Sequence, residues 1–138
     1  MSYLIKSKKR VREMGEVFTP PETVKNLLDD FPDSAWSENE TFLDSTCGNG
    51  NLLLEVLSRK IKNGSAPLRA LQTVYGVDVM QDNVWECRRR LFEVSYSYDK
   101  NPTKEWRAAL LTNIRCANAL EKSLEEIFSA PPDEVDKG

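Results

Sequence analysis

The chain has 138 residues, of which 40% are hydrophobic and 30% charged, so we expect one globular domain without a signal peptide or a membrane span. It contains no histidine, which excludes histidine metal ligands and histidine general bases, and its three cysteines lack metal-ligand spacing and fit reduced thiols in the cytoplasm. The net charge of −3 and the pI near 5.1 argue against strong nucleic-acid binding by this chain alone.

Residues 1–14 form a basic N-terminal arm. Its positive charges are close together in the sequence, at Lys6, Lys8, Lys9, Arg10 and Arg12. Two interpretations stay open, a solvated tail and an arm that contacts nucleic-acid phosphates.

A helix is predicted after this arm. The segment Thr19–Glu22 indicates its start, with the threonine as the N-cap, Pro20 in the first helical position and the glutamate completing a capping box. Phe18 precedes the cap, so it can pack on the first turn or stack on a planar ligand. The apolar face of the helix consists of Val24, Leu27, Leu28 and Phe31. Pro32 ends the helix, and residues 33–40 indicate a polar connection.

The stretch Thr41–Leu54 has the pattern of a strand, a tight turn and a helix start. The apolar run Thr41–Leu43 predicts a buried strand that ends at Asp44. The turn contains Gly48 and Gly50, which let the backbone adopt positive φ and approach a ligand closely. The helix that follows has unpaired N–H groups at its start. Its apolar face consists of Leu53, Val56, Leu57 and Ile61.

The second strand is predicted over Thr73–Asp78, and its terminal carboxylate can accept ribose hydroxyls or cap the next helix. That helix is predicted from Asp82 to Val94, and residues 95–102 are predicted to be a loop. One face of the helix carries three arginines, which indicate either a solvated face or a DNA patch. They are Arg88, Arg89 and Arg90.

The rest of the chain predicts a helix from Asn101 and a third strand over Asn113–Ala117 that ends at Asn118. The inward-facing residues of that helix are Trp106, Ala109 and Leu110. A capping box at Ser123 opens a brief helix, and residues 130–138 form a polar tail.

The three predicted strands therefore end in Asp44, Asp78 and Asn118. The right-handed crossover rule brings the ends of such strands to one edge of a parallel sheet, where α/β folds bind ligands. We predict an α/β fold with a nucleoside site at this edge.

Four segments, in this order, resemble the N-terminal half of the catalytic domain of DNA N6-adenine methyltransferases of restriction–modification type. They are Gly15–Glu22, Phe42–Leu53, Tyr75–Val79 and Ala117–Leu120. Ser45 stands where that family commonly has proline, and Asn118 stands where it usually has aspartate. The resemblance implies a partial Rossmann-like, S-adenosyl-L-methionine (SAM)-dependent methyltransferase fold over residues 15–129, with about three parallel strands.

The resemblance also implies the roles of the site residues. Asp44 and the turn backbone would hold the amino-acid end of SAM, Asp78 the ribose hydroxyls, and Asn118 the adenine amine. Phe18 and Thr19 would line the methionine and adenine side. The cofactor-binding residues implied are Phe18, Thr19, Asp44, Ser45, Cys47, Gly48, Gly50, Asp78, Val79, Asn118 and Ala119.

The family's catalytic motif, Asn or Asp followed by Pro-Pro and Tyr or Phe, is absent from the sequence. The segment Ala130–Asp133 contains two prolines but lacks the polar acceptor and the ring that grip a flipped adenine. The resemblance therefore implies a SAM-binding part of a DNA adenine-N6 methyltransferase-like protein that transfers no methyl group as this chain alone. It can be a truncated piece, a short protein completed by a second polypeptide, or a non-catalytic binder of SAM or of a host methyltransferase. The alternative of another class is an interaction module with a vestigial cofactor pocket.

The resemblance also bears on partners, because the family pairs the first strand with a fourth strand that is missing here. Thr41–Ser45 then becomes a sheet edge without lysine or proline, which are the usual protection against edge pairing. We expect this edge to be covered by a second copy in a homodimer, or by the N-terminal helix and tail, and we prefer the homodimer. DNA contact is expected to be weak or to go through a partner.

Overall fold

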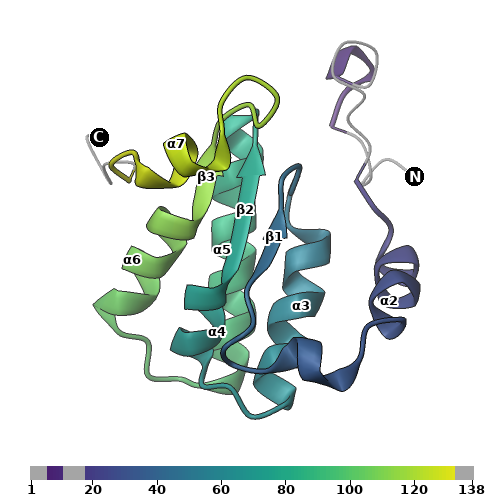
Figure 1. Ribbon diagram of the computed structural model, residues 1–138, viewed down its shortest axis with the longest axis vertical. Helices are drawn as coiled ribbons and strands as arrows, with labels where there is room; N and C mark the ends of the chain where they lie inside the picture. The colour runs from purple at the N-terminus through teal and green to yellow at the C-terminus, as the bar shows by residue number, and fades with distance from the viewer. Residues whose placement is uncertain (1–5, 11–17, 133–138) are drawn as a thin grey trace.

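The centre of the computed structural model, which describes residues 6–10 and 18–132, is a parallel three-stranded sheet (Figure 1). The strands are β1 (Phe42–Asp44), β2 (Val74–Asp78) and β3 (Ile114–Cys116). β2 lies between the other two, and Asp44 pairs with Gly76 of β2. The predicted α/β class, with a parallel sheet and flanking helices, is confirmed.

The helices follow the strands in the alternation that parallel sheets require. They are α2 (Pro21–Asp29), the 3₁₀ helix η2 (Asp33–Trp36), α3 (Asn51–Lys62), α4 (Pro67–Thr73), α5 (Gln81–Tyr98), α6 (Lys104–Asn113) and α7 (Leu124–Ser129). No helix in the described part of the chain is both long and apolar enough to cross a membrane.

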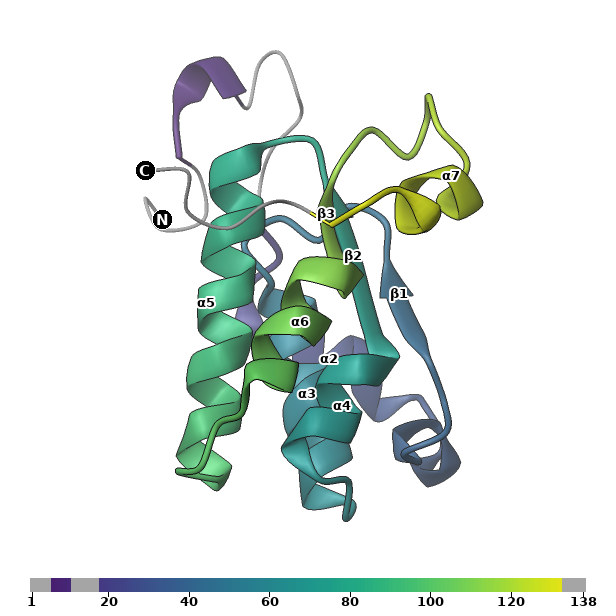
Figure 2. The ribbon, with the colours of Figure 1, turned by 90° about the vertical axis from the view of Figure 1, so that its left-hand side faces the viewer.

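The two faces of the sheet are covered unequally. Successive residues of β2 point to opposite faces. A side chain at Gly76 would come within 2.7 Å of Leu53 Cδ1 on α3, whereas the Tyr75 ring packs edge-on against Phe128 of α7 at 5.3 Å between centroids. Figure 2 accordingly shows α3 to α6 on one side of the sheet and α7 on the other.

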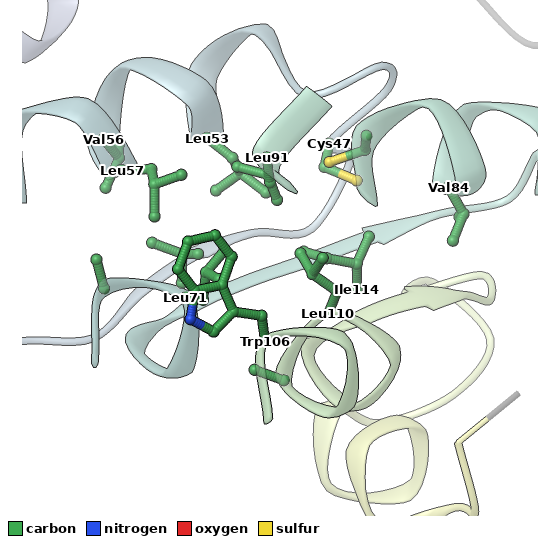
Figure 3. Packing of buried hydrophobic residues seen from close by; sticks show 14 of the residues in the cluster. Cys47, Leu53, Val56, Leu57, Leu71, Val84, Leu91, Trp106, Leu110 and Ile114 are labelled. Atoms are coloured by element: carbon green, nitrogen blue, oxygen red, sulfur yellow. The ribbon is translucent and has the colours of Figure 1, made fainter. Parts of the chain in front are cut away.

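The hydrophobic core lies between the sheet and the α3–α6 layer (Figure 3). Leu53 on α3 and Leu91 on α5 are 0% exposed, and Trp106 of α6 is 2% exposed. Burial of such side chains contributes roughly 1.5–3 kcal/mol each. This layer therefore gives the strand ends a rigid support.

The edge strand β1 is less buried than the sequence predicted. Leu43 is 39% exposed, and it lies on the face of the sheet that α7 covers, beside Tyr75. Phe128 of α7 packs on Tyr75 of β2, and α7 follows β3, which lies at the opposite edge of the sheet from β1. The prediction of a buried strand is therefore wrong for Leu43.

The start of α2 also differs from the prediction. Pro20 is the N-cap residue and Pro21 occupies the first turn, and no side chain caps the helix. A residue before proline is pushed toward extended backbone, and Pro20 has φ −62° and ψ 146°, so the helix cannot begin before Pro21. Thr19 is not the cap. On the predicted apolar face only Val24 and Leu28 are buried.

Residues 33–40 are more ordered than a polar connection. They include η2, whose Trp36 is 6% exposed and lies under the Arg59 guanidinium at 5.4 Å. Lys60 of α3 is 0% exposed, and its Nζ donates to the carbonyl oxygens of Ser37, at 2.9 Å, and Glu40. Burial lowers the pKa of Lys60. These bonds tie the connection to the core just before β1.

α4 was not predicted from the sequence, and α5 ends later than predicted. α4 begins at Pro67, a first-turn proline, and runs directly into β2. α5 continues to Tyr98 through residues predicted to be a loop. Its last turns pack on α3, where the Tyr98 hydroxyl lies 2.9 Å from Ser58 Oγ. Tertiary packing thus extends a helix that local patterning ends.

The three arginines of α5 do not share one face. An α-helix turns by roughly 100° per residue, so three successive side chains point in three directions. Arg88 is 3% exposed and its Nε donates to the Ile114 carbonyl at 3.1 Å, whereas Arg89 pairs with Glu93 on the surface at 2.8 Å. Neither the solvated face nor the DNA patch describes all three.

Candidate functional site

A cleft of about 660 Å³ opens at the carboxyl ends of the three strands, which is the upper end of the sheet in Figure 1. Residues from all three strand ends and from the segment before α2 line it together. The lining residues are Phe18, Thr19, Asp44, Ser45, Thr46, Cys47, Gly48, Asn49, Asn51, Leu52, Asp78, Val79, Ala117, Asn118, Ala119, Leu120 and Leu124. The topology thus assembles one site from segments that include Phe18 near one end of the chain and Leu124 near the other.

The glycine turn between β1 and α3 forms one wall of the cleft. Gly48 and Gly50 have φ of 53° and 96°, a region that other residues adopt only with strain. A side chain at Gly48 would come within 2.9 Å of Phe18 Cδ1, so the Phe18 ring packs directly on the turn. Phe18 is 5% exposed. The turn and the segment before α2 are therefore in close contact.

Asp78 at the end of β2 holds this turn in place. Its Oδ1 accepts from the Gly48 N–H at 3.1 Å, and its Oδ2 accepts from the Met80 N–H at 3.1 Å and from Asn83 Nδ2 at 3.0 Å. A carboxylate has about four lone-pair sites, so most of its acceptor capacity is used within the chain. The Asp78 carboxylate is thus part of the framework of the cleft.

Asp44 at the end of β1 has a different environment. Its Oδ1 accepts from the Thr46 N–H at 3.1 Å. Burial raises the pKa of Asp44, the nearby Asp78 charge raises it further, and the bonds from Thr46 oppose the shift. A cation placed beside Asp44 would relieve this penalty.

The third strand end contributes apolar surface and an amide. Asn118 Oδ1 accepts from the Leu120 N–H at 2.9 Å, which folds the chain back over the cleft. The Leu120 side chain is 96% exposed and Val79 is 37% exposed, so both present apolar surface at the mouth. Such surface can pack against a planar ring.

Comparisons with protein-family models, curated proteins and solved structures found no match. The residues predicted for the site are nevertheless brought together by the fold. All of them line the cleft except Gly50, which is the N-cap of α3 and whose added side chain would meet Cys87 Sγ at 2.8 Å. Their binding roles stay predictions.

Some residues of the site were missed. Thr46 and Asn51 line the cleft, and their place in the predicted turn was the only signal for them. Asn49 also lines the cleft, and its backbone was part of the turn expected to hold the ligand. Leu124 comes from α7, and no sequence pattern linked it to the site. Arg90 approaches the same turn from α5, where its neighbours suggested a surface role.

The cysteine of the turn is unsuited to nucleophilic chemistry. Cys47 is 5% exposed, and a hydrogen bond with Cys87 together with burial raises the pKa of Cys47. Thiolate is the reactive form, so this thiol stays protonated near neutral pH. Figure 3 shows the Cys47 side chain within the packed layer.

The described part of the basic arm contacts acidic side chains near the cleft. Lys6 Nζ lies 2.9 Å from Asp82 Oδ2 and 3.0 Å from Glu86 Oε1, and Arg10 Nη1 lies 2.8 Å from Asp82 Oδ2. The Arg10 and Lys6 bonds lower the pKa of Asp82. Neither open interpretation of the arm anticipated these ion pairs, and Arg12 lies outside the described residues.

Proposed function

We propose that this chain binds SAM in the cleft and forms the cofactor-binding part of a DNA adenine-N6 methyltransferase-like protein. The three parallel strands would then be part of a Rossmann-like methyltransferase sheet, with the glycine turn as its cofactor loop. We propose no methyl transfer by this chain alone, because the catalytic motif is absent from the sequence.

The observation that carries the proposal is the charge of the cleft lining. Among the described residues the lining contains two carboxylates, Asp44 and Asp78, and no lysine or arginine. SAM carries a sulfonium and an ammonium group, whereas dinucleotides and nucleoside triphosphates carry phosphates. Dinucleotide sites also bind phosphates with backbone N–H groups and use one carboxylate for the ribose, so the second carboxylate of this lining, Asp44, is what disfavours such ligands here. The cleft therefore favours a cationic nucleoside.

The residues of the cleft fit the parts of SAM. Asp44 would accept from the ammonium group, and the N–H groups at the start of α3 would face the carboxylate. Val79 and Leu120 would pack on the adenine ring. Asp78 would reach the ribose hydroxyls only through the acceptor capacity that the chain leaves unused.

Calorimetric titration tests the proposal. We expect the parent protein to bind SAM and not ATP, with micromolar or weaker affinity. Asp44→Asn should weaken SAM binding about ten- to a hundredfold, because a hydrogen bond to a charged group contributes roughly 1.5–3 kcal/mol. Asp99→Asn is the matched control, since Asp99 lies just after α5 and accepts only from Asn101 in the described contacts. ATP binding as tight as SAM binding would refute the charge argument.

The Asp78 bonds favour one alternative function, an interaction module whose pocket is vestigial. A ribose-binding acid would need free acceptors, and most of those on Asp78 are engaged. The absence of any SAM binding by the parent protein would support this alternative. A tritiated-methyl transfer assay on DNA, with the chain alone and with candidate partners, distinguishes an enzyme subunit from a non-catalytic SAM binder and from an interaction module.

A further inference from the structure

Arg90 of α5 reaches across to the glycine turn. Its Nη1 donates to the Asn49 carbonyl oxygen at 2.9 Å and to Asn51 Oδ1 at 2.8 Å. Hydrogen bonds from an ionised donor are stronger than neutral ones, and the bond from Arg90 to Asn51 is partly buried. Arg90 does not line the cleft, so it acts on the site through the turn.

Asn51 continues this contact to the segment before α2. Its Nδ2 donates to the Thr19 carbonyl oxygen at 2.7 Å. Both partners define the amide orientation, because an arginine only donates and a carbonyl only accepts. A linked set of bonds therefore runs from Arg90 through Asn51 to Thr19.

The same segment places Phe18 against Gly48, and Phe18 and Thr19 both line the cleft. The cap that would otherwise anchor this segment is missing, since no side chain caps α2. Among the described hydrogen bonds, the Asn51 amide is what joins Thr19 to the turn. Release of this bond would leave the packing of Phe18 on Gly48 to hold this segment at the turn.

We propose that Arg90 and Asn51 form a clasp that holds Phe18 and Thr19 against the glycine turn, with Arg90 as a positioning residue for the ligand site. The identity of the ligand rests on the proposed SAM function, but the clasp itself does not. Asn51 transmits the effect of Arg90, because its Oδ1 accepts from Arg90 and its Nδ2 donates to the Thr19 carbonyl oxygen.

Hydrogen exchange of the ligand-free protein tests the clasp without reference to SAM. The probe is the group of amides in residues 18–28, compared with those of α6 as an internal reference. Arg90→Lys keeps the charge but shortens the side chain and removes the planar fork. Asn51→Asp keeps the acceptor for Arg90 but loses the donor to Thr19. Arg89→Lys is the matched control, since Arg89 pairs with Glu93 on the surface.

We expect Arg90→Lys and Asn51→Asp to speed exchange in residues 18–28 about tenfold, with no change in α6 and none in Arg89→Lys. SAM affinity, measured by calorimetry on the same variants, should fall in the first two by a similar factor. Equal acceleration in α6 would show a merely structural arginine and overturn the clasp, as would unchanged exchange in both variants. If Arg90→Lys does not fold, Asn51→Asp decides. A parent protein that binds no SAM would refute the proposed function and leave the exchange result to judge the clasp.

Discussion

The aspartates that end β1 and β2 have similar sequence surroundings but opposite situations in the structure. Asp78 ends the central strand and accepts from three donors of its own chain, whereas Asp44 ends the edge strand and accepts from Thr46. A central strand has loops on both sides that need support, and an edge strand has them on one side. The place of a strand in the sheet therefore decides whether its terminal carboxylate builds the site or remains available to a ligand.

The largest difference between the strands should appear in their tolerance of a change in side-chain volume. Gly76→Ala in β2 places a methyl group 2.7 Å from Leu53 Cδ1 and 3.0 Å from Cys47 Sγ, so we expect about 2–3 kcal/mol lower free energy of unfolding. Leu43→Ala in β1 removes a side chain that is 39% exposed and should cost about 0.5 kcal/mol. Urea denaturation of both variants measures this, and equal losses would contradict the contrast.

Replacing each carboxylate by the amide of asparagine should change the free energy of unfolding by different amounts. Asp78→Asn replaces one oxygen by an NH₂ group that faces N–H donors, so we expect a loss of about 1–2 kcal/mol in the free energy of unfolding. Asp44→Asn can keep the bond from Thr46 and removes a charge that burial disfavours, so its loss should be near zero. Urea denaturation at pH 7 checks both, and a costly Asp44→Asn would place that carboxylate in the framework too.

The pH dependence of SAM binding sharpens the same contrast. Burial raises the pKa of Asp44 above 3.8, so protonation begins at a higher pH than for an exposed aspartate and removes the charge that would attract the ammonium group of SAM. We expect SAM affinity to be constant at high pH and to fall, by about ten- to a hundredfold in all, as the pH drops through this raised pKa. Calorimetry across pH should show this decline in the parent protein and a flat profile in Asp44→Asn.

Self-association tests the exposed edge of β1. The homodimer remains our proposal for what covers Leu43, because within the described residues the side chain stays exposed. Leu43→Lys places a charge at the edge, which is a common protection against strand pairing. We expect light scattering at micromolar concentration to report a dimer for the parent and a monomer for the variant, with stability changed by less than about 0.5 kcal/mol. A monomeric parent would reject the dimer.

The smallest effect should come from the ion pairs beside the β2 end. Lys6 and Arg10 lower the pKa of Asp82, so their stabilisation is complete above the ordinary value of 3.8 and is lost as the pH falls toward the lowered value. The Asp82 side chain is 52% exposed, so solvent screening leaves only about 0.2–1 kcal/mol. Asp82→Asn should be less stable than the parent by this amount at pH 7. At low pH, where Asp82 of the parent is protonated, the two proteins should be equally stable. High salt should reduce the difference from the parent.

The sequence predicted much of the site because the determinants are local. Strand ends, glycines with positive φ and the parallel crossover rule together bring Asp44, Asp78 and Asn118 to one cleft. The helix N-cap predicted at Ser123 is confirmed, because its Oγ accepts from the Glu126 N–H at 3.1 Å. Each of these features depends on neighbours a few residues away.

The features that were missed depend on tertiary contacts. Arg90 follows two other arginines in the sequence, which suggested a common surface role, and only the packing of α5 on α3 directs it toward Asn51. One of the hydrogen bonds that Asp78 accepts comes from the Gly48 N–H, thirty positions earlier in the chain. The missed 3₁₀ helix buries Trp36 in a stretch of mostly polar residues. Composition alone cannot report such contacts.

Lys60 gives the molecule a natural chemical reporter. It is the one lysine in the described part of the chain that is buried, and its ammonium group is occupied by the carbonyls of Ser37 and Glu40. Amine-reactive reagents should modify the surface lysines within the folded protein and spare this one. Acylation of Lys60 then requires the protein to open, so the fraction modified after a short pulse of reagent counts the molecules that have unfolded.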